Sequence, residues 1–242
     1  SLTVLKVLDD GTLHPVDHVI DNTWTRFENL TDVASVQAGD QLYIVAGGSD
    51  DGLSLFILTP SGTLVLLDTI ADTNATSLQN ISSLSAAYVG GKIQVYATSE
   101  TETGITILNF DPGPIGTSFL GSDNSERLSG SGDNDIISGN AGNDVLLGHD
   151  GDDILLDGSG MDTMIGGSGA DIFVLTADDM PDTIIDFQPG WDRLDLSGYS
   201  MLYDLSSVTI QPMPCGAKII YRNEALDVYR HGGGTLTASH FT

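Results

Sequence analysis

Aspartate residues recur at nine-residue intervals in the middle of the chain. The sequence places them at Asp135, Asp144, Asp153, Asp162 and Asp171. An ionised carboxylate is a hard oxygen ligand, and a calcium ion requires about six to eight such oxygens. One aspartate cannot supply that number, so the remaining ligands must come from the neighbouring chain. The spacing therefore indicates a series of calcium sites.

Glycine-rich turns separate these aspartates. The nine-residue frames start at Gly121, Gly130, Gly139, Gly148, Asp157 and Gly166. Glycine adopts positive φ angles without strain, which allows several backbone carbonyls to point at one ion. The predicted metal residues are the five aspartates above together with Gly130, Gly132, Asp133, Gly139, Ala141, Gly142, Gly148, Asp150, Gly151, Asp157, Gly158, Ser159, Gly160, Gly166, Gly167, Ser168 and Gly169.

The end of each frame must form a short strand that positions the turn. Its eighth residue is always apolar: Leu128, Ile137, Leu146, Leu155, Met164 and Phe173. Two frames complete one coil of 18 residues, so each frame stacks on the frame after the next. We therefore expect Asp135 to share an ion with Asp153, Asp144 with Asp162, and Asp153 with Asp171. The ligand count predicts roughly three to five calcium ions.

The frame at residues 166–174 reads G-G-S-G-A-D-I-F-V. This pattern resembles the nonapeptide of RTX, or haemolysin-type, calcium-binding proteins. The segments 182–187, 190–192 and 194–197 are similar to the part that closes the β-roll in serralysin-like proteins. The resemblance implies a right-handed parallel β-roll and an uncleaved C-terminal signal for Gram-negative type I secretion. It also implies a secreted, extracellular or cell-surface location and folding that depends on calcium.

The flanking regions read as β-structure too, so the predicted class is all-β. Residues 8–13 align with residues 59–64, a period of about 51 residues, and each copy has the strand content of one propeller blade. We expect a blade-like antiparallel β domain at 1–116, the RTX roll at 117–174, and a β-rich cap with the secretion signal at 175–242.

The composition limits the range of partners. The 242 residues include 34 acidic and 8 basic side chains, a net charge of −26, which disfavours nucleic acid. No apolar stretch is long enough for membrane insertion. Cys215 is the single cysteine, so no internal disulfide can form. The expected partner is calcium, and self-association or completion of the blade-like domain by other chains is left open.

No catalytic residues are assigned. The segment from His14 to His18 is a poor zinc motif, because Pro15 interrupts the helix that such a motif requires. The leading hypothesis is a non-enzymatic structural, adhesive or assembly protein outside the cell. The alternative is the C-terminal secretion and folding part of a larger secreted enzyme or toxin, with a hydrolase or cytolysin domain upstream of Ser1.

Overall fold

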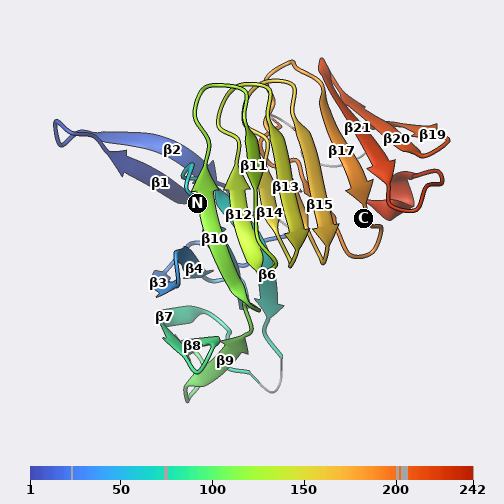
Figure 1. Cartoon of the computed structure of the whole chain (residues 1–242). Coiled ribbons are helices and arrows are strands. Elements are labelled where there is room, and N and C mark those ends of the chain that lie inside the picture. Colours follow the sequence, from blue (N-terminus) through green and yellow to red (C-terminus); the bar gives the residue numbers. More distant parts are fainter. Residues whose placement is uncertain (23, 74–75, 200–201, 203–206, 242) are drawn as a thin grey trace. The chain divides into compact units, whose positions relative to one another are not determined.

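A computed structural model describes residues 1–22, 24–73, 76–199, 202 and 207–241. Its contacts divide the chain into two units, Ser1–Gly113 and Pro114–Thr242. Strands β1 to β21 make up both units, and one short 3-10 helix, η2 (Ala238–His240), lies near the end (Figure 1). None of the helices in the part described is long and apolar enough to cross a membrane.

The first unit contains three antiparallel sheets. β1 (Leu2–Val7) and β2 (Leu13–Val19) form a hairpin. A four-stranded meander follows with β3 (Asp32–Ala38), β4 (Gln41–Gly47), β5 (Gly52–Leu58) and β6 (Leu64–Ala71). The third sheet has β7 (Ile81–Val89), β8 (Lys92–Ser99) and β9 (Thr106–Phe110). The four-stranded meander is the content of one propeller blade.

The internal repeat of this unit is visible in its hydrogen bonds. Oδ1 of Asp21 accepts from the Thr25 hydroxyl at 2.7 Å and from the Phe27 N–H at 3.2 Å. Oδ1 of Asp72 does the same for Thr76 at 2.9 Å and Leu78 at 3.0 Å. Each aspartate thereby fixes the turn that precedes a sheet. Asn29 and Asn80 also share a positive φ, 46° and 49°.

The second unit begins with a five-stranded parallel sheet. Its order is β10 (Ile115–Leu120), β12 (Asn134–Ser138), β14 (Ile154–Leu156), β16 (Ile172–Val174) and β18 (Arg193–Asp195). Neighbouring strands in the middle of this sheet pair at a distance of 18 residues, as Ile136 with Ile154 and Ile154 with Ile172. The expected stacking of each frame on the frame after the next is therefore confirmed.

The opposing sheet of this unit has seven strands. Its parallel part is β11 (Arg127–Ser129), β13 (Val145–Asp150), β15 (Thr163–Ser168), β17 (Asp182–Phe187) and β21 (Glu224–Arg230). β20 (Gly216–Tyr221) and β19 (Thr209–Met213) then extend it in antiparallel fashion. Figure 1 shows the strands of this sheet side by side, from β11 to β19.

The apolar eighth residues of the frames form the core between these two sheets. Ile137, Leu146, Leu155, Met164 and Phe173 are completely buried, and Leu128 packs against them. The same cluster continues through Phe187 and Val228, so the last strands close the end of the roll. The predicted all-β class with a parallel β-roll is confirmed, and the parallel stacking runs beyond the nonapeptides at both ends.

We predict that Asp72→Ala loosens the turn before β7. The Thr76 hydroxyl and the Leu78 N–H lose their acceptor, which costs about 1–2 kcal/mol. Hydrogen–deuterium exchange of a peptide covering residues 72–80 is expected to become roughly ten times faster. Asp51→Ala, at an exposed position of the same unit, is the control. Equal exchange in the two variants would contradict this role of Asp72.

Candidate metal centre

The sixth-position aspartates form two ladders along the roll. The backbone N–H of Asp135 donates to Oδ1 of Asp153 at 2.8 Å, and that of Asp153 donates to Oδ1 of Asp171 at 3.0 Å. On the other side, the N–H of Asp144 donates to Oδ1 of Asp162 at 2.7 Å. The structure therefore brings together each of the three pairs expected to share an ion.

The fifth-position residues bind in the opposite direction. Asn134 Oδ1 accepts from the N–H of Asp152 at 2.9 Å, and Asn143 Oδ1 accepts from the N–H of Met161 at 2.9 Å. Asp152 Oδ1 in turn accepts from the N–H of Ala170 at 2.8 Å. Each turn is thus tied to the coil before it and to the coil after it, which holds the turns in register.

The second carboxylate oxygen, Oδ2, of most sixth-position aspartates accepts no hydrogen bond. Among the described residues, Oδ2 has no hydrogen-bond partner in Asp144, Asp153, Asp162 and Asp171, although it is buried. These side chains are at most 2% exposed. A buried charged oxygen without a partner is strongly unfavourable, and coordination of a cation removes that penalty. The residues present therefore fit a bound cation.

The first glycine of each frame makes room beside this oxygen. A Cβ atom built on Gly148 would clash with Oδ2 of Asp153 and would lie 2.5 Å from the carbonyl oxygen of Gly166. A Cβ on Gly130 would lie 2.6 Å from Oδ2 of Asp135 and 2.7 Å from the Gly148 carbonyl oxygen. A side chain at these positions would occupy the space between a carboxylate and a stacked carbonyl, which are both suitable calcium ligands.

The electrostatics of the ladders oppose ionisation when no cation is present. Burial, together with the nearby carboxylates of Asp135, Asp152 and Asp150, raises the pKa of Asp153 to about 7, although the hydrogen bond from the Asp135 N–H opposes the rise. Burial likewise raises the pKa of Asp171 to about 8. The ionised carboxylates of the roll are therefore unfavourable until a proton or a divalent cation neutralises them.

The remaining predicted metal residues lie in the turns or at the strand ends next to them. Positive φ angles occur at Gly142, Gly151, Gly158, Gly160, Gly167 and Gly169. A Cβ on Gly132 would meet nothing within 4 Å, so that position does not require glycine. Ala141 and Ser159 form an isolated parallel bridge, and Asp150 pairs with Ser168 between β13 and β15.

Two acidic turn residues differ from the ladder aspartates. The carboxylate of Asp157 accepts backbone N–H groups of Gly158 and Thr176, so its side chain is already bonded. Its carbonyl lies against Gly139, as the Gly148 carbonyl lies against Gly130. Asp133 is exposed. No group of three His, Cys, Asp or Glu side chains forms a cage in the described part, so backbone oxygens must complete any ion's shell.

Two aspartates outside the predicted metal set, Asp182 and Asp192, continue both ladders past the last nonapeptide. Oδ1 of Asp182 accepts from the N–H of Asp162 at 3.0 Å, and Oδ1 of Asp192 accepts from the N–H of Asp171 at 3.2 Å. Burial raises the pKa of both, to about 7 for Asp182 and about 6 for Asp192. The signal was present, because each is followed two residues later by an apolar residue, as in the nonapeptide.

Comparison with known proteins gives the following matches. A family model of the RTX calcium-binding nonapeptide repeat (4 copies) matches residues 120–155 and 147–179. No curated protein matches the chain. Among solved structures, the AlgE6R3 subunit of the Azotobacter vinelandii mannuronan C5-epimerase is 30% identical, with a TM-score of 0.36. That alignment covers 49% of this chain and 78% of the subunit.

The extracellular lipase LipA from Serratia marcescens is 16% identical, with a TM-score of 0.40. The alignment covers 91% of this chain, which spans 31% of the lipase. The family model and the ladders of residues 120–179 agree on the same turns. Through these repeats, the chain belongs to the RTX calcium-binding nonapeptide-repeat proteins.

Proposed function

We propose that the chain is a secreted protein whose roll folds when calcium binds between its stacked turns. The observation that carries this proposal is the buried, unpartnered Oδ2 that recurs in Asp144, Asp153, Asp162 and Asp171. A single buried oxygen without a hydrogen-bond partner would be weak evidence for a cation site. Four of them at equivalent positions indicate that successive turns present the same oxygen to a cation, whereas Oδ2 of Asp135 accepts from the N–H and the hydroxyl of Ser131.

Calcium binding supplies enough free energy to decide whether the roll folds. Extracellular modules bind calcium with dissociation constants of about 10⁻⁴–10⁻³ M. A ligand that binds only the folded state stabilises it by RT ln(1 + [L]/Kd), so about four sites at ten times Kd contribute about 5–6 kcal/mol. That is comparable to the whole stability of a small domain. Type I secretion of an unfolded chain into a calcium-rich medium fits this energetics.

The proposed ligands are the carboxylates of the ladders and the carbonyls of the turns named in the sequence analysis. Three aspartate pairs were expected, namely 135 with 153, 144 with 162 and 153 with 171. The hydrogen bonds of Asp182 and Asp192 add two equivalent pairs, with Asp162 and Asp171 respectively. Five pairs agree with an estimate of roughly three to five ions.

For the wider role, we propose a non-enzymatic structural, adhesive or assembly protein. The observation that favours assembly is β9, which lies at the edge of its sheet among the described strands. The equivalent strand β5 is covered by β6. Ile107 on β9 and Ile105 just before it are 54% and 66% exposed, and an apolar edge strand invites pairing with another chain. The alternative, a folding and secretion part of a larger enzyme or toxin, would be decided by the upstream reading frame.

We predict that Asp153→Asn weakens calcium-dependent folding. The substitution removes one charge from two adjacent pairs while leaving an acceptor for the N–H of Asp135. The calcium midpoint for roll formation, followed by far-UV circular dichroism, is expected to rise by about tenfold or more. Asp123→Asn makes the same charge change at an exposed position of the roll. An unchanged midpoint in Asp153→Asn would refute the assignment of this carboxylate.

We predict that acid partly replaces calcium. Because burial raises the folded-state pKa of Asp153 to about 7 and of Asp171 to about 8, above the value of 3.8 for a free carboxyl, the folded state binds more protons than the unfolded state. The calcium-free roll therefore loses stability as pH rises from about 4 to about 8. Circular dichroism in chelator should show more β-structure at pH 5 than at pH 8. A calcium-saturated sample is the control, and no gain on acidification would contradict the prediction.

We predict that Ile107→Lys reduces self-association in calcium. A lysine at this edge position carries charge into any strand pairing across β9. Sedimentation velocity of the wild-type chain should show assemblies that are lost in the variant, whereas Lys92→Gln, on the neighbouring strand, should leave them intact. A wild-type chain that stays monomeric at every concentration tested would rule out assembly through this edge.

A further inference from the structure

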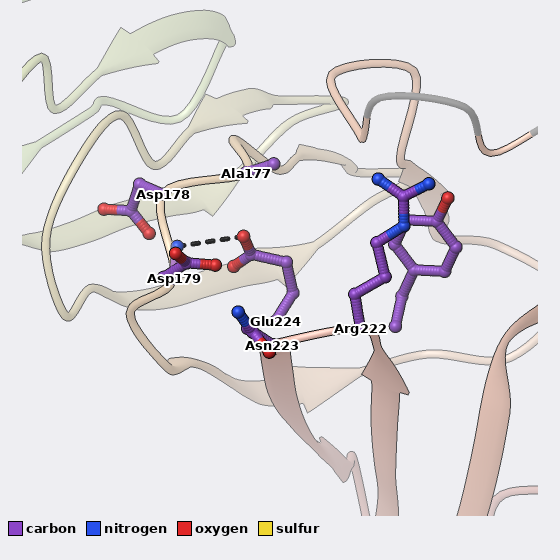
Figure 2. A pocket seen from close by; sticks show the side chains of 7 residues that line it. Ala177, Asp178, Asp179, Arg222, Asn223 and Glu224 are labelled. Carbon is purple, nitrogen blue, oxygen red and sulfur yellow. Dashed lines mark hydrogen bonds between the residues drawn. The ribbon is translucent and has the colours of Figure 1, made fainter.

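A pocket lies beyond the nonapeptides, where the loop after β16 meets the start of β21. Its volume is about 360 Å³, and its lining includes Asp178, Asp179 and Glu224. Figure 2 shows Glu224 reaching from the start of β21 toward residues 177–179. Glu224 lies far outside the repeats, whereas residues 177–179 follow the last nonapeptide frame and end the family-model match at 147–179. The two sides of the pocket are separated by about 45 residues in sequence.

Glu224 carries the same signature as the ladder aspartates. It is 6% exposed, and its Oε1 accepts from the N–H of Asp179 at 2.9 Å. Its Oε2 is buried and has no hydrogen-bond partner among the described residues. Oε1 therefore holds the side chain in place through the Asp179 N–H, and Oε2 lies at the pocket without a hydrogen-bond donor. A buried oxygen of this kind requires a cation or a proton.

The surroundings of Glu224 are predominantly acidic. Asp178 lines the same pocket, and its Oδ1 and Oδ2 accept from the N–H groups of Met180 and Gly160 respectively. The carboxylates of Asp178 and Glu224 both lie close enough to Asp182 to repel its charge. The guanidinium of Arg222 lies over the Tyr221 ring, 5.2 Å from its centroid. The lining thus includes three carboxylates and one guanidinium, a net negative charge.

From this geometry we propose that the pocket is a further calcium site, at the end of the repeat region, in which Glu224 is the principal ligand and the exposed Asp179 is the second carboxylate. No three acidic, His or Cys side chains form a closed cage in the part that the structure describes. Backbone oxygens and water therefore complete the shell, as calcium allows. The ion connects the loop at 177–179 to β21, and so fixes the terminal strands to the last coil.

The site is tested by counting the calcium ions held by the full chain in native mass spectrometry. Glu224→Gln keeps the acceptor for the Asp179 N–H and removes the charge, so we expect one ion fewer than in the wild type. Glu100→Gln, at an exposed position of the first unit, should retain every ion. The same count in Glu224→Gln as in the wild type would overturn the site.

A second measurement covers the case in which Glu224→Gln does not fold. Asp179 is exposed, so Asp179→Asn should fold normally and bind the last ion about tenfold more weakly. Calcium should also slow hydrogen exchange in residues 216–230 of the wild type less strongly in this variant. If neither effect occurs, the site is refuted. The proposed function, on which this site rests, fails separately: it is refuted if the wild-type roll binds no calcium or folds without calcium.

Discussion

Stacked carboxylates inside the roll are the constraint on which the second unit depends. Coils 18 residues apart place Asp135, Asp153 and Asp171 in one column, in which Oδ1 of each later aspartate accepts a hydrogen bond from the backbone N–H of the one before it. Burial and mutual repulsion make this column unfavourable unless positive charge enters it. The family model assigns calcium to these turns, so the cation that the electrostatics require is the one that the repeats bind.

The apolar core is coupled to the same condition. Ile137, Leu155 and Phe173 are buried where successive coils lie on one another, and the same stacking buries the carboxylates. Glycine at the first position lets the backbone approach the carboxylate, as the clash of a Cβ at Gly148 shows. Charge, backbone freedom and hydrophobic burial therefore all bear on the same stacking of the coils.

Aspartate has a different task in the first unit. Asp21 and Asp72 each accept from a hydroxyl and a backbone N–H of their own turn, and both residues are only partly buried, so water can reach them. Asp21 and Asp72 therefore stabilise their own turns through local hydrogen bonds. In the roll, the corresponding oxygen is sealed from water and has no such donor, as in Asp153. The two groups of aspartates therefore differ in whether a buried oxygen is left without a donor.

The sequence by itself determined the roll, because a nine-residue period fixes local conformation. The pairing at 18 residues, the inward eighth residue and the aspartate columns all follow from that period. The tertiary structure alone decided which residues outside the nine-residue period join the aspartate columns or lie next to them. Asp182 and Asp192 join the columns after spacings of 20 and 21 residues, which no strict period predicts. Glu224 meets Asp179 only because β21 pairs with β17, and such a long-range pairing is set by packing rather than by local pattern.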